Sequence, residues 1–121
     1  CALPIYLSSW KAASEGAADR SGELVQLLGC VGRSRAYGSF WAACMLAEGA
    51  VDTVVDASLS FYEVAALLPL IREAGGVAST LEGDLPEHAG ISVAGVHPVS
   101  LVASNTAAVQ QQVLEALAPQ P

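Results

Sequence analysis

The spacing of hydrophobic residues changes several times along the chain, and each change marks a predicted element. Apolar runs rich in β-branched residues predict strands, and apolar residues that recur every three or four positions predict helices. The predicted strands cover residues 3–9, 31–37, 51–56, 77–81 and 100–103. The predicted helices cover residues 21–28, 38–49, 61–74 and 106–117, and the predicted loops cover 11–20 and 82–90. Strands that alternate with helices predict an α/β fold with a layered mixed β-sheet and flanking helices.

Polar residues and glycines mark the predicted ends of these helices. Ser21 and Asn105 each precede a helical pattern and are predicted N-caps. Gly29 is predicted to end the first helix, and Gly49 is the predicted C-cap of the second. Pro69 lies inside the third helical pattern, where we expect it to kink the helix.

The composition excludes several classes of protein. With 121 residues the chain is long enough for one domain, which we place at residues 1–121. The content of 53% hydrophobic and 14% charged residues is not that of a disordered protein. The net charge of −7 without a basic cluster argues against a nucleic-acid partner. The chain contains no apolar run long enough to span a bilayer, so we expect no membrane partner.

The cysteines bear on the cellular location of the protein, and the first residues bear on the origin of the sequence. Three cysteines without C-x-x-C spacing predict neither a disulfide framework nor a zinc site, and they favour a reducing, cytoplasmic location. The first five residues, Cys1 to Ile5, have no basic segment and so do not form a signal peptide. They match the translation of a common sequencing adaptor. We therefore expect a gene fragment in which residues 1–5 are artificial.

Asp56 and Glu63 form the one carboxylate pair that suggests a mechanism. Asp56 ends a predicted apolar strand and Glu63 starts the next helix, so both are expected at the sheet edge where α/β proteins bind ligands. An acid in the first turn of a helix also has a purely stabilising role against the helix dipole. Mg²⁺ is usually held by one or two protein carboxylates with water and phosphate oxygens, so this pair supplies part of such a site.

The other polar candidates carry weaker signals. Ser39 follows Gly38 at a predicted helix start, where it serves either as a cap or as part of an anion or substrate site. His88 and His97 lack metal-ligand spacing and are predicted to be solvated loop residues. Cys30 and Cys44 are each predicted to be small buried apolar residues.

Five motifs in a fixed order resemble the C-terminal half of the inositol monophosphatase family. The order and spacing match from about Leu7 to Leu117, and the lead-in from Arg33 is most similar to the bacterial histidinol-phosphatase branch. In chain order the motifs are Arg35-x-x-Gly38-Ser39, Leu46-Ala47-Glu48-Gly49-Ala50-Val51-Asp52, Phe61-Tyr62-Glu63-Val64-Ala65-Ala66, Arg72-Glu73-Ala74-Gly75-Gly76 and Ala103-Ser104-Asn105.

The resemblance implies a Mg²⁺-dependent phosphomonoesterase that acts on a small phosphate ester. Glu63 stands where the family has a metal-binding aspartate, which implies that it is a metal ligand. Asp56 falls near an acidic position that contacts substrate, and Gly38 and Ser39 fall in the segment that lines the substrate pocket. Arg35 belongs to the same lead-in, so all four are implied substrate-binding residues. The resemblance implies no catalytic residue in this half.

The chain departs from the family pattern in three ways. Glu63 is one methylene longer than aspartate, and Ser39 stands where the histidinol-phosphatase branch often has an acid. The N-terminal glutamate and the D-P-x-D-G-T segment of the family, which supply most metal ligands, are absent. We therefore expect the chain alone to be inactive and its partner to be the missing N-terminal half of the same protein.

Two other functions remain open. The first is a degenerate, non-catalytic family member that acts as a binding or dimerisation module, which the residues at positions 39 and 63 favour. The second is a structural domain whose acids only cap helices. A chain this hydrophobic is also expected to aggregate or form a homodimer when it is produced without its partner half.

Overall fold

A computed structural model describes residues 2–4, 19–37, 39–89, 91–92 and 95–118 of the chain. Its helices are α2 (Ser21–Cys30), α3 (Ser39–Ala47), α4 (Phe61–Glu73), α5 (Pro86–Ala89) and α6 (Ala107–Leu117). Its strands are β1 (Ala2–Pro4), β2 (Arg33–Arg35), β3 (Thr53–Leu59), β4 (Val77–Ser79), β5 (Ile91–Ser92), β6 (Gly95–Val96) and β7 (Val99–Ser104). None of the helices within these ranges has the length and apolar character needed to cross a bilayer.

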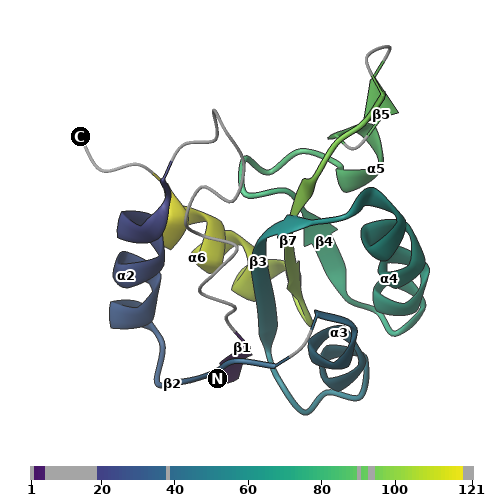
Figure 1. Cartoon of the computed structure of the whole chain (residues 1–121). Coiled ribbons are helices and arrows are strands. Elements are labelled where there is room, and N and C mark those ends of the chain that lie inside the picture. The colour runs from purple at the N-terminus through teal and green to yellow at the C-terminus, as the bar shows by residue number, and fades with distance from the viewer. Residues whose placement is uncertain (1, 5–18, 38, 90, 93–94, 119–121) are drawn as a thin grey trace.

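The central sheet is antiparallel, with strand order β3-β7-β4. Helices cover both of its faces: α3 and α4 lie on one side, and α6, with α2 packed against it, lies on the other (Figure 1). The predicted layered α/β class is confirmed. Within the described residues, however, the parallel and antiparallel pairs lie in different sheets, because β1 and β2 pair parallel in a sheet of their own.

Two hydrophobic clusters fill the spaces between the sheet and its helix layers. Side chains of a strand alternate between the two faces of a sheet, so neighbouring residues enter different clusters. Val54 packs on the α3–α4 side, whereas Val55 packs on the α2–α6 side. Leu101 and Val102 divide in the same way on β7. This alternation fixes which face of the sheet each helix covers.

The helix starts differ from the predictions at two points. Arg20, not Ser21, is the N-cap of α2, and the Ser21 N–H instead bonds to Oδ1 of Asp19 at 2.9 Å. Thr106, not Asn105, caps α6, because its side chain accepts a bond from the Val109 N–H at 3.2 Å.

Asn105 is instead tied to the start of β3. Its backbone N–H donates to the carbonyl of Asp52 at 3.0 Å, and its side-chain amide donates to the Asp52 carboxylate at 3.2 Å. This pair of bonds holds the end of β7 beside the residue that precedes β3. The side chain of Asn105 therefore joins two strands rather than capping a helix.

Glycine ends one helix as predicted and not the other. Gly29 lies inside α2, which continues to Cys30. The prediction that both cysteines are buried is wrong, because Cys30 at the end of this helix is exposed and Cys44 is only partly buried. Gly49 follows α3 with φ of 77°, a left-handed conformation that favours glycine, as its predicted capping role requires. The predicted C-cap of the second helix is therefore confirmed, whereas the predicted end of the first at Gly29 is wrong.

The predicted loop at residues 82–90 contains α5, which an ion pair links to α4. Nη2 of Arg72 lies 2.9 Å from both carboxylate oxygens of Glu87. At the other end of this loop, Arg20 of the α2 N-cap bonds to Glu23 at 2.7 Å and to Glu82 at 2.5 Å. Burial disfavours the charged guanidinium, but the bonds to the two carboxylates outweigh it and raise the pKa of Arg20 above its usual value.

Candidate metal and substrate site

The junction between β3 and α4 is the centre of the candidate site. Ser60 alone separates the two elements, and its backbone N–H donates to Oε2 of Glu63 at 2.9 Å. Ser60 and Glu63 have the spacing of a capping box, in which the acid at the third helical position bonds back to the N-cap. The first turn of α4 therefore fixes the Glu63 carboxylate beside the end of β3. The stabilising role predicted for this acid was against the helix dipole, and the structure adds a capping bond.

Asp56 lies inside β3 rather than at its end. The register between β3 and β7 shifts after Asp56, and pairing resumes at Leu59 with Val99, so the strand extends beyond the predicted boundary at residue 56. Asp56 is 8% exposed, and its Oδ1 accepts a bond from the Ser58 N–H at 3.2 Å. The irregular segment between Asp56 and Ser60 thus separates the two acids along the chain.

Asp56 and Glu63 each carry a carboxylate, the kind of donor group that Mg²⁺ prefers. Carboxylate oxygens are the ligands that Mg²⁺ prefers, and it commonly keeps several waters beside one or two protein carboxylates. No group of three or more His, Cys, Asp or Glu that could hold a metal occurs in the part of the chain described. The described acids therefore have suitable donor chemistry for Mg²⁺, but they do not form a metal-binding group within the described ranges.

Among the described residues, the structure does not bring the predicted substrate-binding residues together in one cluster. Arg35 is exposed at the end of β2, and its Nη1 donates to the carbonyl of its neighbour Ser34 at 2.7 Å. Figure 1 shows β2 near the beginning of β3, away from the first turn of α4. Gly38 lies outside the described residues. Ser39 is the first residue of α3, as predicted from its position.

Aromatic residues beside this segment were missed by the sequence analysis. The rings of Tyr37 and Trp41 lie 5.4 Å apart between centroids, with their planes tilted by 42°. They are four positions apart, on either side of Gly38 and Ser39. Helical i, i+4 spacing could have suggested the contact, but Tyr37 lies before the predicted helix.

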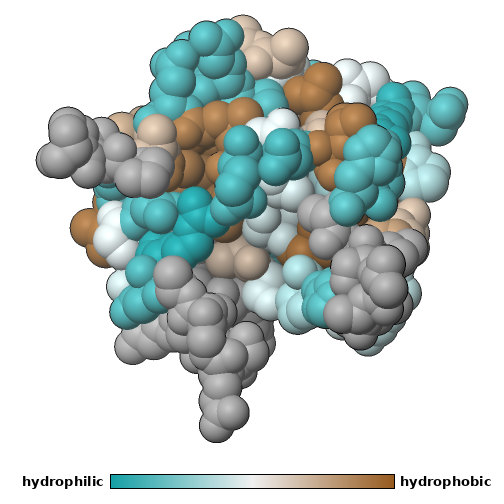
Figure 2. Space-filling view, turned by 90° about the horizontal axis from the view of Figure 1, so that it is seen from above, coloured by the Kyte–Doolittle hydropathy of each residue, from teal (hydrophilic) through white to brown (hydrophobic). Residues whose placement is uncertain are grey.

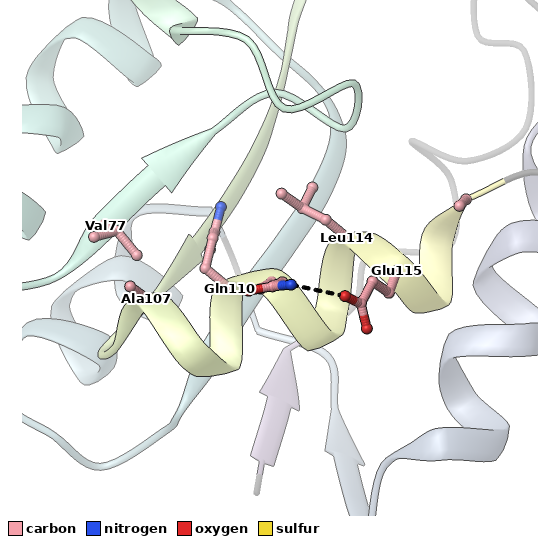
Figure 3. Close-up of a pocket in the computed structure, with 7 residues that line it drawn as sticks. Val77, Ala107, Gln110, Leu114 and Glu115 are labelled. Carbon is pink, nitrogen blue, oxygen red and sulfur yellow. Dashed lines mark hydrogen bonds between the residues drawn. The ribbon is translucent and has the colours of Figure 1, made fainter.

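A shallow cavity of about 450 Å³ lies elsewhere, between α6 and β4 (Figure 3). Its lining residues are Val77, Ala107, Gln110, Gln111, Leu114, Glu115 and Ala118. The acid among them, Glu115, accepts a bond from the side-chain amide of Gln111 at 2.9 Å. Because α6 covers the sheet face opposite α4, this cavity does not belong to the candidate site.

The chain matches the model of the inositol monophosphatase family over residues 7–120 and belongs to this family. The family resemblance predicted from the five motifs is thereby confirmed. Histidinol-phosphatase of Mycobacterium tuberculosis is 41% identical over 88 residues, which are 73% of this chain and 32% of that protein. Histidinol-phosphatase of Streptomyces coelicolor is 42% identical over 64 residues, or 53% of this chain and 24% of that protein. The chain thus spans about a third or less of these curated relatives.

Solved structures of the family share the fold. A staphylococcal inositol monophosphatase II aligns with a TM-score of 0.73 and 20% identity, over 98% of this chain and 43% of that one. An inositol monophosphatase from Zymomonas mobilis aligns with a TM-score of 0.69 and 20% identity, over 96% of this chain and 40% of that one. At this identity the likeness concerns the fold alone.

Proposed function

We propose that the full-length protein that contains this chain is a metal-dependent phosphomonoesterase of the histidinol-phosphatase type. The observation that carries the proposal is the 41% identity over 88 residues with a histidinol-phosphatase. Membership of the inositol monophosphatase family over residues 7–120 supports the same reaction class. Histidinol phosphate is the proposed substrate, and inositol phosphates are the second class of phosphate ester to test.

Mg²⁺ is the proposed metal, and Glu63 is its proposed ligand in this chain. Bound Mg²⁺ would polarise a phosphate oxygen and lower the pKa of a bound water. The capping bond from Ser60 keeps the Glu63 carboxylate in one orientation, which reduces the ordering needed when a metal binds. Asp56, Gly38, Ser39 and Arg35 are the proposed substrate-binding residues.

The remaining metal ligands are proposed to come from the N-terminal half of the same protein. This chain alone is accordingly expected to release no phosphate at a useful rate, and no catalytic residue is assigned to it. Its apolar surface is expected to cause self-association, including homodimers, when it is produced alone. The cytoplasm remains the proposed location, and neither nucleic acid nor membrane is a proposed partner.

The alternative function is a non-catalytic binding or dimerisation module. The engagement of Glu63 in helix capping favours it, because that role alone explains an acid at this position. In this alternative the full-length protein keeps the fold and its stability but shows no dependence on Mg²⁺.

Phosphate release by the full-length gene product, with Mg²⁺ and with a chelator, tests the proposal. We expect Glu63→Gln to weaken Mg²⁺ binding and lower turnover by at least about 10-fold, since even residues that only support metal ligands cost about 10- to 100-fold. Glu63→Asp should preserve or improve both. Glu73→Gln, an exposed change at the other end of α4, is the matched control and should have no effect.

Two results would decide against the proposal. Absence of Mg²⁺-dependent phosphate release from both histidinol phosphate and inositol phosphates would favour the non-catalytic module. An unchanged response of Glu63→Gln to Mg²⁺ would remove this residue from the metal site even if the enzyme is active.

A further inference from the structure

Strand β3 contains one residue more than β7 between two of its paired positions. Asp56 and Leu59 are three positions apart, but their partners on β7 are only two apart. Ala57 and Ser58 therefore lie opposite the single residue Ser100, which is the arrangement of a β-bulge. The extra residue of a bulge is left out of the ladder, and bulges are frequent beside active sites.

The alternation of side chains along β3 identifies Ser58 as the extra residue. Val55 and Ala57 both contact the hydrophobic cluster on the α2–α6 side, as residues two positions apart should. Regular alternation would place Leu59 on this side too, but Leu59 belongs to the cluster on the α3–α4 side. One inserted residue accounts for the change of side. Removal of Ser58 would therefore restore a regular strand.

Asp56 lies on the α3–α4 side of the sheet. Its partner on β7 is Leu101, and directly opposed residues of an antiparallel pair share a face. Leu101 is fully buried in the cluster on the α3–α4 side. Asp56 is thus on the face that α4 covers, and α4 carries Glu63 in its first turn.

The inserted residue supplies a hydrogen-bond donor to Asp56. The carboxylate belongs to a residue that is only 8% exposed, and burial of a charged group costs free energy unless hydrogen bonds replace those to water. The backbone N–H of Ser58 donates to Oδ1 of Asp56 at 3.2 Å. Because the extra residue of a bulge is not needed by the ladder, its N–H can serve the acid. The bulge therefore gives a largely buried carboxylate a donor whose position the backbone fixes.

The bulge immediately precedes the end of β3 that leads into α4, which is the upper end in Figure 1. Figure 2 looks onto this end of the molecule and shows polar residues at the surface between apolar ones. Such a surface suits a ligand with both polar and apolar parts, as a small phosphate ester has.

We propose that Ser58 is a positioning residue, whose backbone N–H fixes the orientation in which the Asp56 carboxylate binds substrate. The inference rests on the proposed function, in which Asp56 contacts substrate and Glu63 binds Mg²⁺. A carboxylate only accepts hydrogen bonds, so it binds the donor groups of a ligand, such as an ammonium, an imidazole N–H or a hydroxyl, and it repels the phosphate. Ser58 therefore acts on the part of the substrate that does not react.

Steady-state kinetics of the full-length gene product, with the phosphate ester that it hydrolyses, test the inference through two variants. Deletion of Ser58 leaves one residue opposite Ser100, as in a regular ladder. Ser58→Pro keeps the chain length but removes the N–H, and proline is tolerated at bulges. We expect each variant to raise KM by about 10-fold or more, the effect of one hydrogen bond to a charged group, and to change the Mg²⁺ requirement by less than about 2-fold.

Ser58→Ala is the conservative counterpart of Ser58→Pro. Alanine keeps the backbone N–H, so this variant should restore the KM of the wild type. Thermal unfolding of each variant shows whether it is folded. If the bulge served only the sheet, the deletion and proline variants would lower the Tm and leave KM unchanged.

An unchanged KM in the folded deletion and proline variants would overturn the inference. An equal rise of KM in Ser58→Ala would do the same, because it would assign the effect to the hydroxyl group. A parallel change in the Mg²⁺ requirement would place the effect at the metal. Loss of folding in both the deletion and the proline variant would show that the sheet, not the acid, requires the bulge, and would also overturn the inference.

The wild type separates this inference from the proposed function. A full-length wild type that releases no phosphate from histidinol phosphate or inositol phosphates refutes the proposed function and this inference with it. An active wild type whose KM is unaffected by the deletion and by Ser58→Pro refutes this inference alone.

Discussion

Ser60 donates its backbone N–H to the carboxylate of Glu63 at 2.9 Å, which ties the end of β3 to the first turn of α4. The bond satisfies a donor at the N-cap that has no partner within the helix. The residue proposed to hold the metal therefore also holds the helix start. Substitutions at position 63 can separate these two roles.

We predict that Glu63→Ala lowers the free energy of unfolding by about 1 kcal/mol, whereas Glu63→Gln leaves it nearly unchanged. Glutamine keeps an oxygen for the Ser60 N–H but loses the charge that would attract Mg²⁺. Urea unfolding of the two variants in the absence of metal measures the difference. Equal losses in both would show that charge at the helix N-terminus, rather than the capping bond, stabilises this turn.

We predict that Pro69→Ala stabilises the protein by about 1–2 kcal/mol. Pro69 lies inside α4, where it lacks the N–H of the helical ladder and crowds the carbonyl one turn earlier. The gain is reduced because alanine makes the unfolded chain more flexible. Leu70→Ala provides a comparison on the same turn, and its effect should be destabilising. A lower unfolding free energy for Pro69→Ala would show that the proline itself is needed for the packing of α4.

We predict that the α4–α5 contact weakens in acid. The N–H of the Glu87 backbone and the Arg72 guanidinium lower the pKa of the Glu87 carboxyl below its usual value. A lowered pKa in the folded state adds stability above the pKa of the unfolded chain, about 4.3 for glutamate, and that stability disappears as the pH falls through the folded value.

Hydrogen exchange of the α5 amides, followed from pH 6 to pH 3, measures this contact after correction for intrinsic rates. The wild type should lose protection over the acidic part of this range. Glu87→Gln should have low protection throughout, without the transition. A transition of the same size in Glu87→Gln would assign it to another acid.

We predict that Gln110→Met destabilises the protein by about 1–2 kcal/mol. Gln110 is 7% exposed, and its Nε2 donates to Oγ of Ser79 at 2.8 Å and to the carbonyl of Val102 at 3.0 Å. Methionine fills similar volume but leaves the Val102 carbonyl without this donor. The loss is limited because the Gln110 Oε1, which is buried without a bond, also disappears.

Gln111→Met is the matched control for that prediction. Gln111 is exposed on the same helix, where its side-chain amide donates to Glu115, so the change should cost less than about 0.5 kcal/mol. Urea unfolding measures both variants. Equal losses would mean that the cost at Gln110 comes from the loss of helix propensity and not from its buried amide.

Long elements with strong boundary signals could be predicted from the sequence. The prediction for α4, residues 61–74, differs from Phe61–Glu73 by one residue, because Ser60 and the Gly75-Gly76 pair enclose a clear apolar period. Short elements could not. The two-residue strands β5 and β6 and the single turn of α5 are too short for any hydrophobic period to appear.

The place of Glu63 in the first turn of α4 could be predicted, but the surroundings of the two acids could not. A carboxylate in the first helical turn at residue 63 follows from the pattern alone, and so does its stabilising role. The extension of β3 beyond Asp56 could not be predicted, because it depends on renewed pairing with Val99, which is far away in the sequence. Likewise, only the position of Asp52 beside β7 decides that Asn105 joins strands while Thr106 caps α6.

In the proposed function, Glu63 has two roles, as the capping residue of α4 and as a metal ligand, and other side chains would serve these roles to different degrees. Aspartate would bind a cation with the family's usual geometry but reaches less far back to Ser60, and glutamine would keep the turn but not the charge. In the proposed function, glutamate would serve both roles. A lineage that gave up phosphate chemistry would be free to drift from glutamate to glutamine without losing its fold, so the side chains found at this position in related genes would record which copies still use a metal.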